Sequence, residues 1–173
     1  PLLRFAAAEA SRSGSPLHLV HVLHMPPSGP ESFVVAFEAA REIGNRLLER
    51  HAARARELVG GRLPVTTELL EQSLGTAGDI VEVSANARLV ALEHRQLHWL
   101  RRLATGSTTL GVAARARVPV VSVPEGWDPT RPVTDQVGVG VDDPVNSDRV
   151  LRVAFERAAE RGARLCVLHA WWL

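Results

Sequence analysis

Apolar residues recur along this chain with two alternating spacings, one typical of helices and one typical of buried strands. Residues 2–13 place apolar side chains three and four positions apart, which predicts an amphipathic helix ending at Gly14. The short apolar run Leu17–Val22 predicts a strand. The same alternation continues to the end of the chain, with further helices predicted over 31–59, 79–87 and 147–161 and a short one opening at Gly106-Ser107, and further strands over 65–70, 89–92, 118–123, 136–141 and 164–169.

This alternation of strands and helices indicates a fold class. Strands separated by helices form βαβ units, which build a parallel sheet with right-handed crossovers. In such sheets the ligand cleft lies at the carboxyl ends of the strands. We therefore predict an α/β fold with helices on both faces of a parallel sheet.

Residues 124–135 interrupt the pattern. This segment contains Pro124, Pro129 and Pro132 and shows no periodicity, which is typical of a linker. We therefore divide the chain into a first domain over 1–123, a linker over 124–135 and the opening of a second domain over 136–173.

The second segment repeats the first. Residues 2–24 aligned with 150–172 show identities that include Leu3 with Leu151, Gly14 with Gly162, and His21 with His169. Two amphipathic helix–strand units could match at a few positions by chance. The alternative, which we favour, is a tandem duplication with an offset of 148 residues between the copies.

Composition removes several classes of function. The net charge is +1, which does not indicate the strongly basic character of a nucleic-acid-binding protein. The chain has no lysine for a P-loop, a Schiff base or a kinase site. The single cysteine, Cys166, excludes a disulfide framework and a thiolate zinc site. No stretch approaches the ~20 apolar residues of a membrane span, so the expected location is the cytoplasm.

At this point the chain resembles the universal stress protein family, specifically its tandem two-domain members. The resemblance rests on Val139-Gly-Val-Asp142, on the helix and strand over 151–170, and on Gly106-Ser-Thr-Thr109 followed by the strand 118–123. It implies a Rossmann-like, adenine-nucleotide-hydrolase-like domain whose five-stranded parallel sheet has the order 3-2-1-4-5. It also implies a homodimer.

Nucleotide-binding members of this family carry a G-x2-G-x9-G-(S/T) signature, of which this chain keeps half. The first two glycines fall on Glu93 and Gln96, and the last two positions fall on Gly106 and Ser107. A Glu93 carboxylate about 5 Å from a phosphate charge would repel it by roughly 3 kcal/mol at an effective dielectric near 20. The signature is therefore degenerate.

The resemblance makes ATP the candidate ligand, with magnesium as the only metal. A turn at a helix start favours a phosphate, and the resemblance adds contacts to adenine or ribose from two further residues. The predicted nucleotide-binding residues are Gly106, Ser107, Thr108 and Thr109 for the phosphates, and Asp142 and Val22 for the nucleoside. For Asp142, a turn or cap role is the alternative.

The family's central first strand has no counterpart in the first copy, which begins at its first helix. An empty central position would leave two rows of buried backbone groups unpaired. We expect 136–141 to fill this central position, because the connector 124–135 can extend to ~40 Å and is therefore long enough to bring the strand there. The domain would then be permuted, or strand-exchanged in a swapped homodimer, and Asp142 would lie beside Val22.

We predict a stress-response protein that acts as a binding and regulatory module with an unknown partner and without catalysis. Two alternatives remain open, an ATP-binding protein with weak or no hydrolysis and a protein-interaction module using the loop 93–105. A metal site at His18, His21 and His24 is disfavoured because alternate residues of a strand point to opposite faces.

Overall fold

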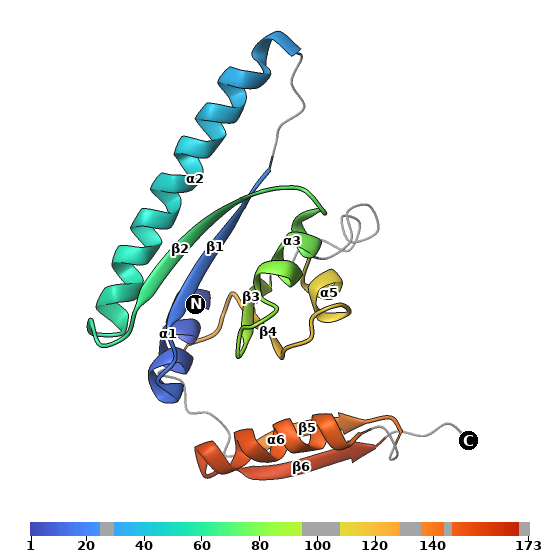
Figure 1. Ribbon diagram of the computed structural model, residues 1–173. Helices are drawn as coiled ribbons and strands as arrows, with labels where there is room; N and C mark the ends of the chain where they lie inside the picture. The colour runs from blue at the N-terminus through green and yellow to red at the C-terminus, as the bar shows by residue number, and fades with distance from the viewer. Residues whose placement is uncertain (25–29, 95–107, 129–135, 144–146, 170–173) are drawn as a thin grey trace. The chain divides into compact units, whose positions relative to one another are not determined.

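The computed structural model describes residues 1–173 except 25–29, 95–107, 129–135, 144–146 and 170–173 (Figure 1). It divides into two compact units, which we call unit 1, Pro1–Pro129, and unit 2, Thr130–Leu173. The division falls within the segment over which the sequence predicts a linker.

Unit 1 alternates helices and strands as the hydrophobic pattern predicts. One prediction is displaced, because the helix expected over 79–87 runs over Thr76–Val83. The elements are α1 (Leu2–Ser13), β1 (Leu17–Leu23), α2 (Pro30–Leu58), β2 (Val65–Glu71), α3 (Thr76–Val83), β3 (Val90–His94), α5 (Thr108–Ala113) and β4 (Val120–Pro124).

The strands of unit 1 form two separate parallel pairs. β1 runs beside β2 from Leu17↔Val65 onward, and β3 runs beside β4 from Val90↔Val120 onward. In the family's order 3-2-1-4-5, whose strand 1 has no counterpart in unit 1, β1 and β2 correspond to strands 2 and 3, and β3 and β4 correspond to strands 4 and 5. Among the described residues no strand joins β1 to β3, so the prediction of one five-stranded sheet is wrong for this structure.

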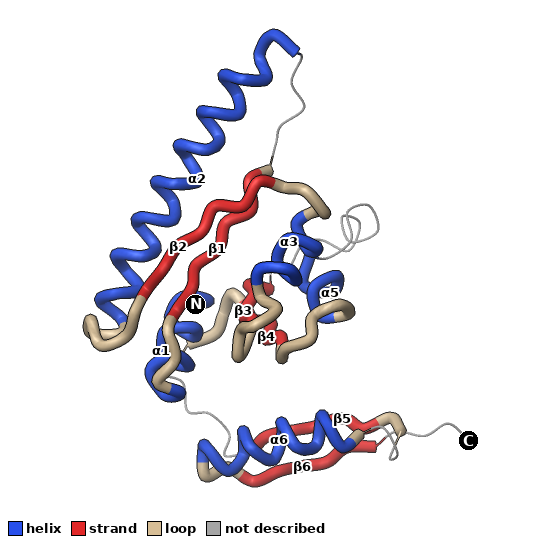
Figure 2. The backbone as a smooth tube through the Cα atoms, viewed as in Figure 1, coloured by secondary structure: helices blue, strands red, loops and turns tan. Residues whose placement is uncertain are grey.

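Helices connect the two pairs of strands. α1 contacts β1 as well as β3 and β4, and it packs against α2, which covers β1 and β2. α3 contacts β1 and packs against α5, which contacts β3 and β4 (Figure 2). Unit 1 is therefore held together through its helices as well as through its strand ladders.

The face of α2 that meets the strands is lined by small and aliphatic residues. Leu48, Ala52 and Ala55 of α2, and Val59 directly after it, are each at most 7% exposed, and their spacing of three and four residues places them on one stripe. The first half of α2 extends beyond β1 and β2 in Figure 1, where Phe33 and Phe37 stack on each other.

Unit 2 is a single βαβ unit. It contains β5 (Gln136–Val141), α6 (Asp148–Arg161) and β6 (Arg164–His169), and β5 runs parallel to β6 from Gln136↔Arg164 to Val141↔His169. β5 therefore pairs with β6, and the predicted insertion of 136–141 into the first domain is not what the structure shows. The physical reason is proximity, since β6 follows β5 after one helix and the loop to be closed is short.

The helices of the repeat end in the same way. Gly14 follows α1 with φ 64° and Gly162 follows α6 with φ 60°, both in the left-handed region, and their amides bond to Ala10 and Ala158, which the repeat aligns. At the start of α6, however, Ser147 makes no capping bond, because its hydroxyl bonds to the Asp143 carbonyl.

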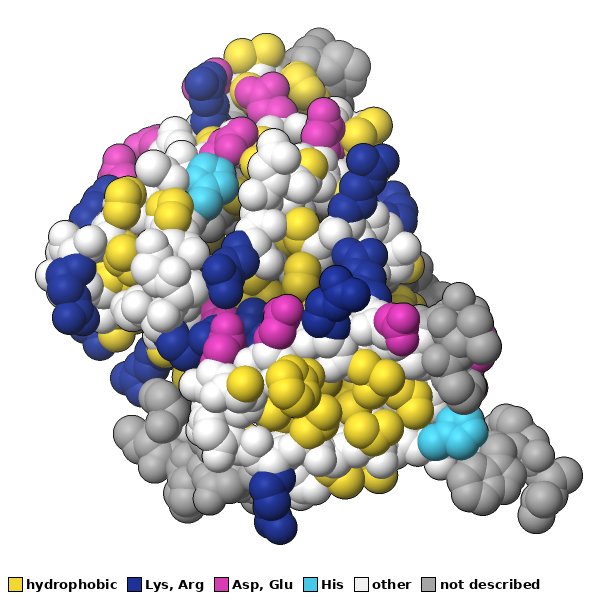
Figure 3. Space-filling model, turned by 60° about the horizontal axis from the view of Figure 1, so that its bottom comes forward, with side chains coloured by type: hydrophobic (Ala, Val, Ile, Leu, Met, Phe, Trp, Pro, Cys, Tyr) yellow, Lys and Arg dark blue, Asp and Glu magenta, His cyan; other side chains and the backbone are white. Residues whose placement is uncertain are grey.

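Unit 2 exposes much of its apolar surface. Hydrophobic side chains gather on it in Figure 3, and the large ones that are at least 44% exposed are Val150, Phe155, Val167 and Leu168. A lone βαβ unit has a strand pair and one helix, so only one face of the strands is covered.

A substitution at Gly111 tests the packing of α3 against α5. A Cβ built on Gly111 would lie 3.1 Å from the Ala77 Cβ, so Gly111→Val is expected to destabilise unit 1 by about 1–3 kcal/mol through overpacking. Urea unfolding followed by circular dichroism measures this change. Ala113→Val, on an exposed position of the same helix, is the matched control. Equal effects of both variants would contradict close packing at Gly111.

Candidate functional site

The segment between β2 and α3 is fixed by a buried carboxylate. Asp79 is 5% exposed, and its Oδ1 accepts hydrogen bonds from the Leu74 N–H and the Ser73 hydroxyl, both at 2.9 Å. The Ser73 N–H adds longer contacts of 3.3 Å to both carboxylate oxygens. Asp79 therefore holds the chain where it leaves the carboxyl end of β2.

These donors also set the charge state of Asp79. The Leu74 N–H, helped by the Ser73 hydroxyl and N–H, keeps the pKa of the Asp79 carboxyl below its ordinary value, although burial acts in the opposite direction. Asp79 is thus a structural anion at neutral pH. Asp79 is not among the residues predicted from the sequence, although an acidic residue in the first turn of a helix that follows a Ser-Leu-Gly segment is a signal for it.

The predicted phosphate-binding residues lie at the start of α5, as far as the structure describes them. Thr108 and Thr109 are the first two residues of that helix, Thr108 exposed and Thr109 half-buried. Gly106 and Ser107 lie outside the described residues. The packing of α3 against α5 brings the segment after β2 close to the helix that follows β3.

The predicted nucleoside-binding residues belong to different units. Val22 is half-buried near the end of β1, opposite Leu70 of β2. Asp142 is exposed and follows β5 directly in unit 2. Their common site with the threonines therefore stays a prediction.

Glu93 occupies the end of a strand. It is the fourth residue of β3 and lies in register with Val123 of β4. Its backbone is therefore at the carboxyl end of the β3–β4 pair, the edge at which parallel sheets bind ligands. Gln96, the other replaced glycine, lies outside the described residues.

The histidines of β1 have neighbours of their own. The His18 ring lies between the Thr66 hydroxyl, 2.8 Å from Nδ1, and the Glu68 carboxylate, 3.0 Å from Nε2. His21 lies under Gly44 of α2, where a Cβ would meet its ring at 3.2 Å. Within the described parts of the chain, no three His, Cys, Asp or Glu side chains are placed to hold a metal ion.

Comparison with known proteins decides the family. The model of the universal stress protein family matches residues 1–124. The chain belongs to the universal stress protein family. This confirms the family resemblance drawn from the sequence, whereas its tandem two-domain form stays a prediction, and the match agrees with the α/β arrangement of unit 1.

Individual universal stress proteins extend the likeness over both units. A universal stress protein of Mycolicibacterium smegmatis is 29% identical over 175 residues, which cover 98% of this chain and 58% of that relative. The chain thus spans little more than half the length of that relative. The structure of a universal stress protein from Archaeoglobus fulgidus superposes with a TM-score of 0.66 at 16% identity, covering 96% of this chain and 59% of that one.

A further similar structure contains a ligand. It is a universal stress protein in complex with cAMP, with a TM-score of 0.50 and 18% identity, and the match covers 71% of this chain and 84% of that chain. In the described residues of the present chain, no helix combines the length and apolar character needed to cross a membrane.

Proposed function

We propose that this universal stress protein acts in the stress response as a binding and regulatory module, and that unit 1 binds an adenine nucleotide weakly. The observation that carries the proposal is Glu93 at the carboxyl end of β3, where the nucleotide-binding signature of the family has glycine. A carboxylate there repels phosphate, and a side chain limits how closely the backbone approaches it.

Several features support an adenine nucleotide as the ligand. Thr108 and Thr109 offer hydroxyl and backbone donors at the start of α5, after the loop that follows β3. The cAMP complex of a protein with the same fold supports the choice of adenine compounds as probes. Val22 of unit 1 is the proposed contact to the nucleoside, Asp142 of unit 2 remains a prediction from the sequence, and magnesium would accompany ATP.

Titration calorimetry with MgATP and with cAMP tests the proposal. Glu93→Gln removes the negative charge, and a Glu93→Gly/Gln96→Gly variant also restores both glycines. We expect each to bind MgATP at least tenfold more tightly than the unchanged chain. A factor of ten in affinity corresponds to roughly 1.4 kcal/mol of binding free energy. Glu49→Gln removes the same charge from an exposed position of α2 and serves as the control.

The outcomes separate the parts of this proposal. Equal affinity in all four proteins would show that Glu93 does not limit binding. No binding in any of them would rule out a nucleotide site in unit 1 and leave protein interaction as the function.

A protein-interaction role is the second candidate. Leu74, just before α3, is 65% exposed, and Leu110 on α5 is 70% exposed. An exposed leucine just before α3 and another on the neighbouring helix α5 offer apolar contacts to a partner protein. Cross-linking of the purified chain, compared with a Leu74→Ser/Leu110→Ser variant, tests whether these side chains contribute to self-association.

A further inference from the structure

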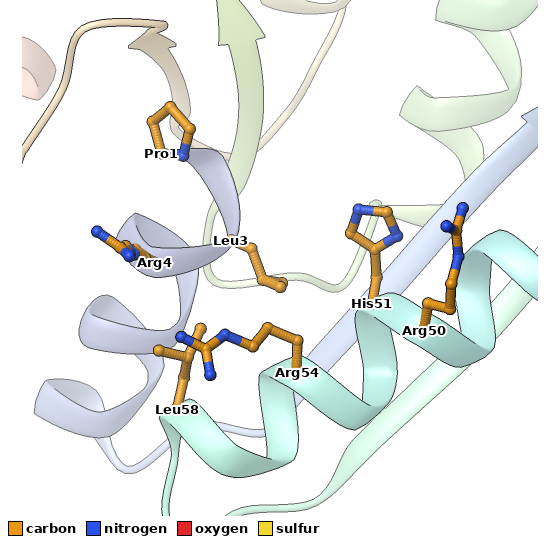
Figure 4. A pocket seen from close by; sticks show the side chains of 7 residues that line it. All are labelled: Pro1, Leu3, Arg4, Arg50, His51, Arg54 and Leu58. Carbon is orange, nitrogen blue, oxygen red and sulfur yellow. The ribbon is translucent and has the colours of Figure 1, made fainter.

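A cavity between α1 and α2 is lined by positively charged side chains. Its volume is about 400 Å³, within the ~300–1,000 Å³ range of small-molecule sites. None of its lining residues belongs to the predicted nucleotide site. The lining side chains include Leu3 and Arg4 from α1, and Arg50, His51, Arg54 and Leu58 from α2 (Figure 4).

The side chains are spread along the cavity. In Figure 4, Leu3 points from α1 toward α2, and Arg54 extends from α2 toward α1. The guanidinium of Arg50 lies at the other end, beyond His51. The cavity therefore has an apolar wall flanked by positive charges at separate points.

These charges are only partly neutralised by the protein. Arg54 donates to the Glu57 carboxylate at 2.6 Å in an exposed ion pair. For Arg4 and Arg50, the described part of the chain supplies no ion-pair or hydrogen-bond partner. No carboxylate is among the residues that line the cavity in the described structure. The whole chain carries a net charge of only +1, so this is a local excess.

His51 adds a polar atom with a defined role. Its Nδ1 lies 2.8 Å from the Leu47 carbonyl, which can only accept, so Nδ1 carries a proton and donates. This bond orients the ring on the helix and leaves Nε2 for another contact.

We propose that this cavity binds an oligophosphate group, the chemistry shared by inorganic pyrophosphate and the phosphate chain of a nucleotide. Guanidinium groups pair with phosphate oxygens through two parallel hydrogen bonds, and several charged points suit an extended anion better than a single phosphate. Pyrophosphate should therefore bind more tightly than orthophosphate.

Titration with inorganic pyrophosphate, orthophosphate and MgATP, followed by amide chemical shifts and calorimetry, tests this site. Arg50→Gln is expected to weaken pyrophosphate binding about tenfold, since it removes a charge-assisted contact. The matched control is Arg41→Gln, an exposed arginine of the same helix that lies outside the cavity and likewise has no ion-pair or hydrogen-bond partner among the described residues. Thermal unfolding of both variants checks that they remain folded.

The distribution of shifts identifies the source of the phosphate. Shifts of the Leu3 and His51 amides with both pyrophosphate and MgATP, lost in Arg50→Gln and kept in Arg41→Gln, would support the cavity as an oligophosphate site. Shifts confined to pyrophosphate would assign it to the inorganic anion. Equal weakening by both variants, or shifts at Val22 and Thr109 alone, would overturn the proposal while leaving the nucleotide site intact.

Discussion

Replacing Ala55 with aspartate is expected to destabilise unit 1 strongly. Ala55 is 0% exposed, on the stripe of α2 that faces β1 and β2, so the new carboxylate would be buried without a partner. Burial of an unpaired charge costs about 3–5 kcal/mol, against a total stability of about 5–15 kcal/mol for a typical domain. Urea unfolding followed by circular dichroism measures the loss.

Ala53→Asp provides the control for this prediction. Ala53 is two residues away on the same helix and is exposed, so its aspartate stays in water. The control carries the same charge near the same helix end and should change stability by less than about 1 kcal/mol. Equal losses in the two variants would contradict the packing of α2 on the strands.

Replacing Asp79 with asparagine is expected to loosen the segment between β2 and α3. The carboxylate accepts from the Ser73 hydroxyl and from the N–H groups of Ser73 and Leu74, whereas an amide has one acceptor oxygen and no charge. We expect lower thermal stability and at least tenfold faster amide exchange at Leu74. Glu82→Gln, on an exposed position of α3, should leave both unchanged.

The same carboxylate gives a defined pH dependence. Because the pKa of Asp79 is lowered in the folded state, the unfolded state binds more protons as the solution is acidified. The stabilisation is complete above the ordinary aspartate pKa of about 3.9 and is lost as the pH falls through the lower folded-state value. Thermal unfolding from pH 7 to pH 2 should therefore show an acid-dependent loss that is smaller in Asp79→Asn. Parallel curves for the two proteins would contradict the role assigned to Asp79.

The accuracy of the sequence predictions follows the range of the interactions involved. The ends of α1 and α6 were predicted correctly because a glycine in the left-handed region stops a helix by local backbone chemistry. The helix predicted over 79–87 begins too late, because Asp79 lies within the first turn of α3 and not at its start. In the structure Asp79 reaches back five and six residues to Leu74 and Ser73 from within the first turn.

The candidate site was predictable in part. Family membership and the positions of Thr108, Thr109 and Val22 could be deduced from motifs and strand ends. The cavity between α1 and α2 could not, since Arg4 and Arg50 are far apart in the chain and each belongs to a helix face that looks solvated when considered alone.

The sequence by itself determined most of the helices and strands of this protein, with α3 displaced, and its family. Hydrophobic spacing and glycine conformations act within a few residues, so they can be inferred from the chain alone. Only the tertiary structure decided that β5 pairs with β6, that β1 and β3 belong to separate pairs of strands, and that arginines of two helices line one cavity. These outcomes depend on contacts between distant segments, where backbone pairing and side-chain packing select one arrangement among several that the same periodicity allows.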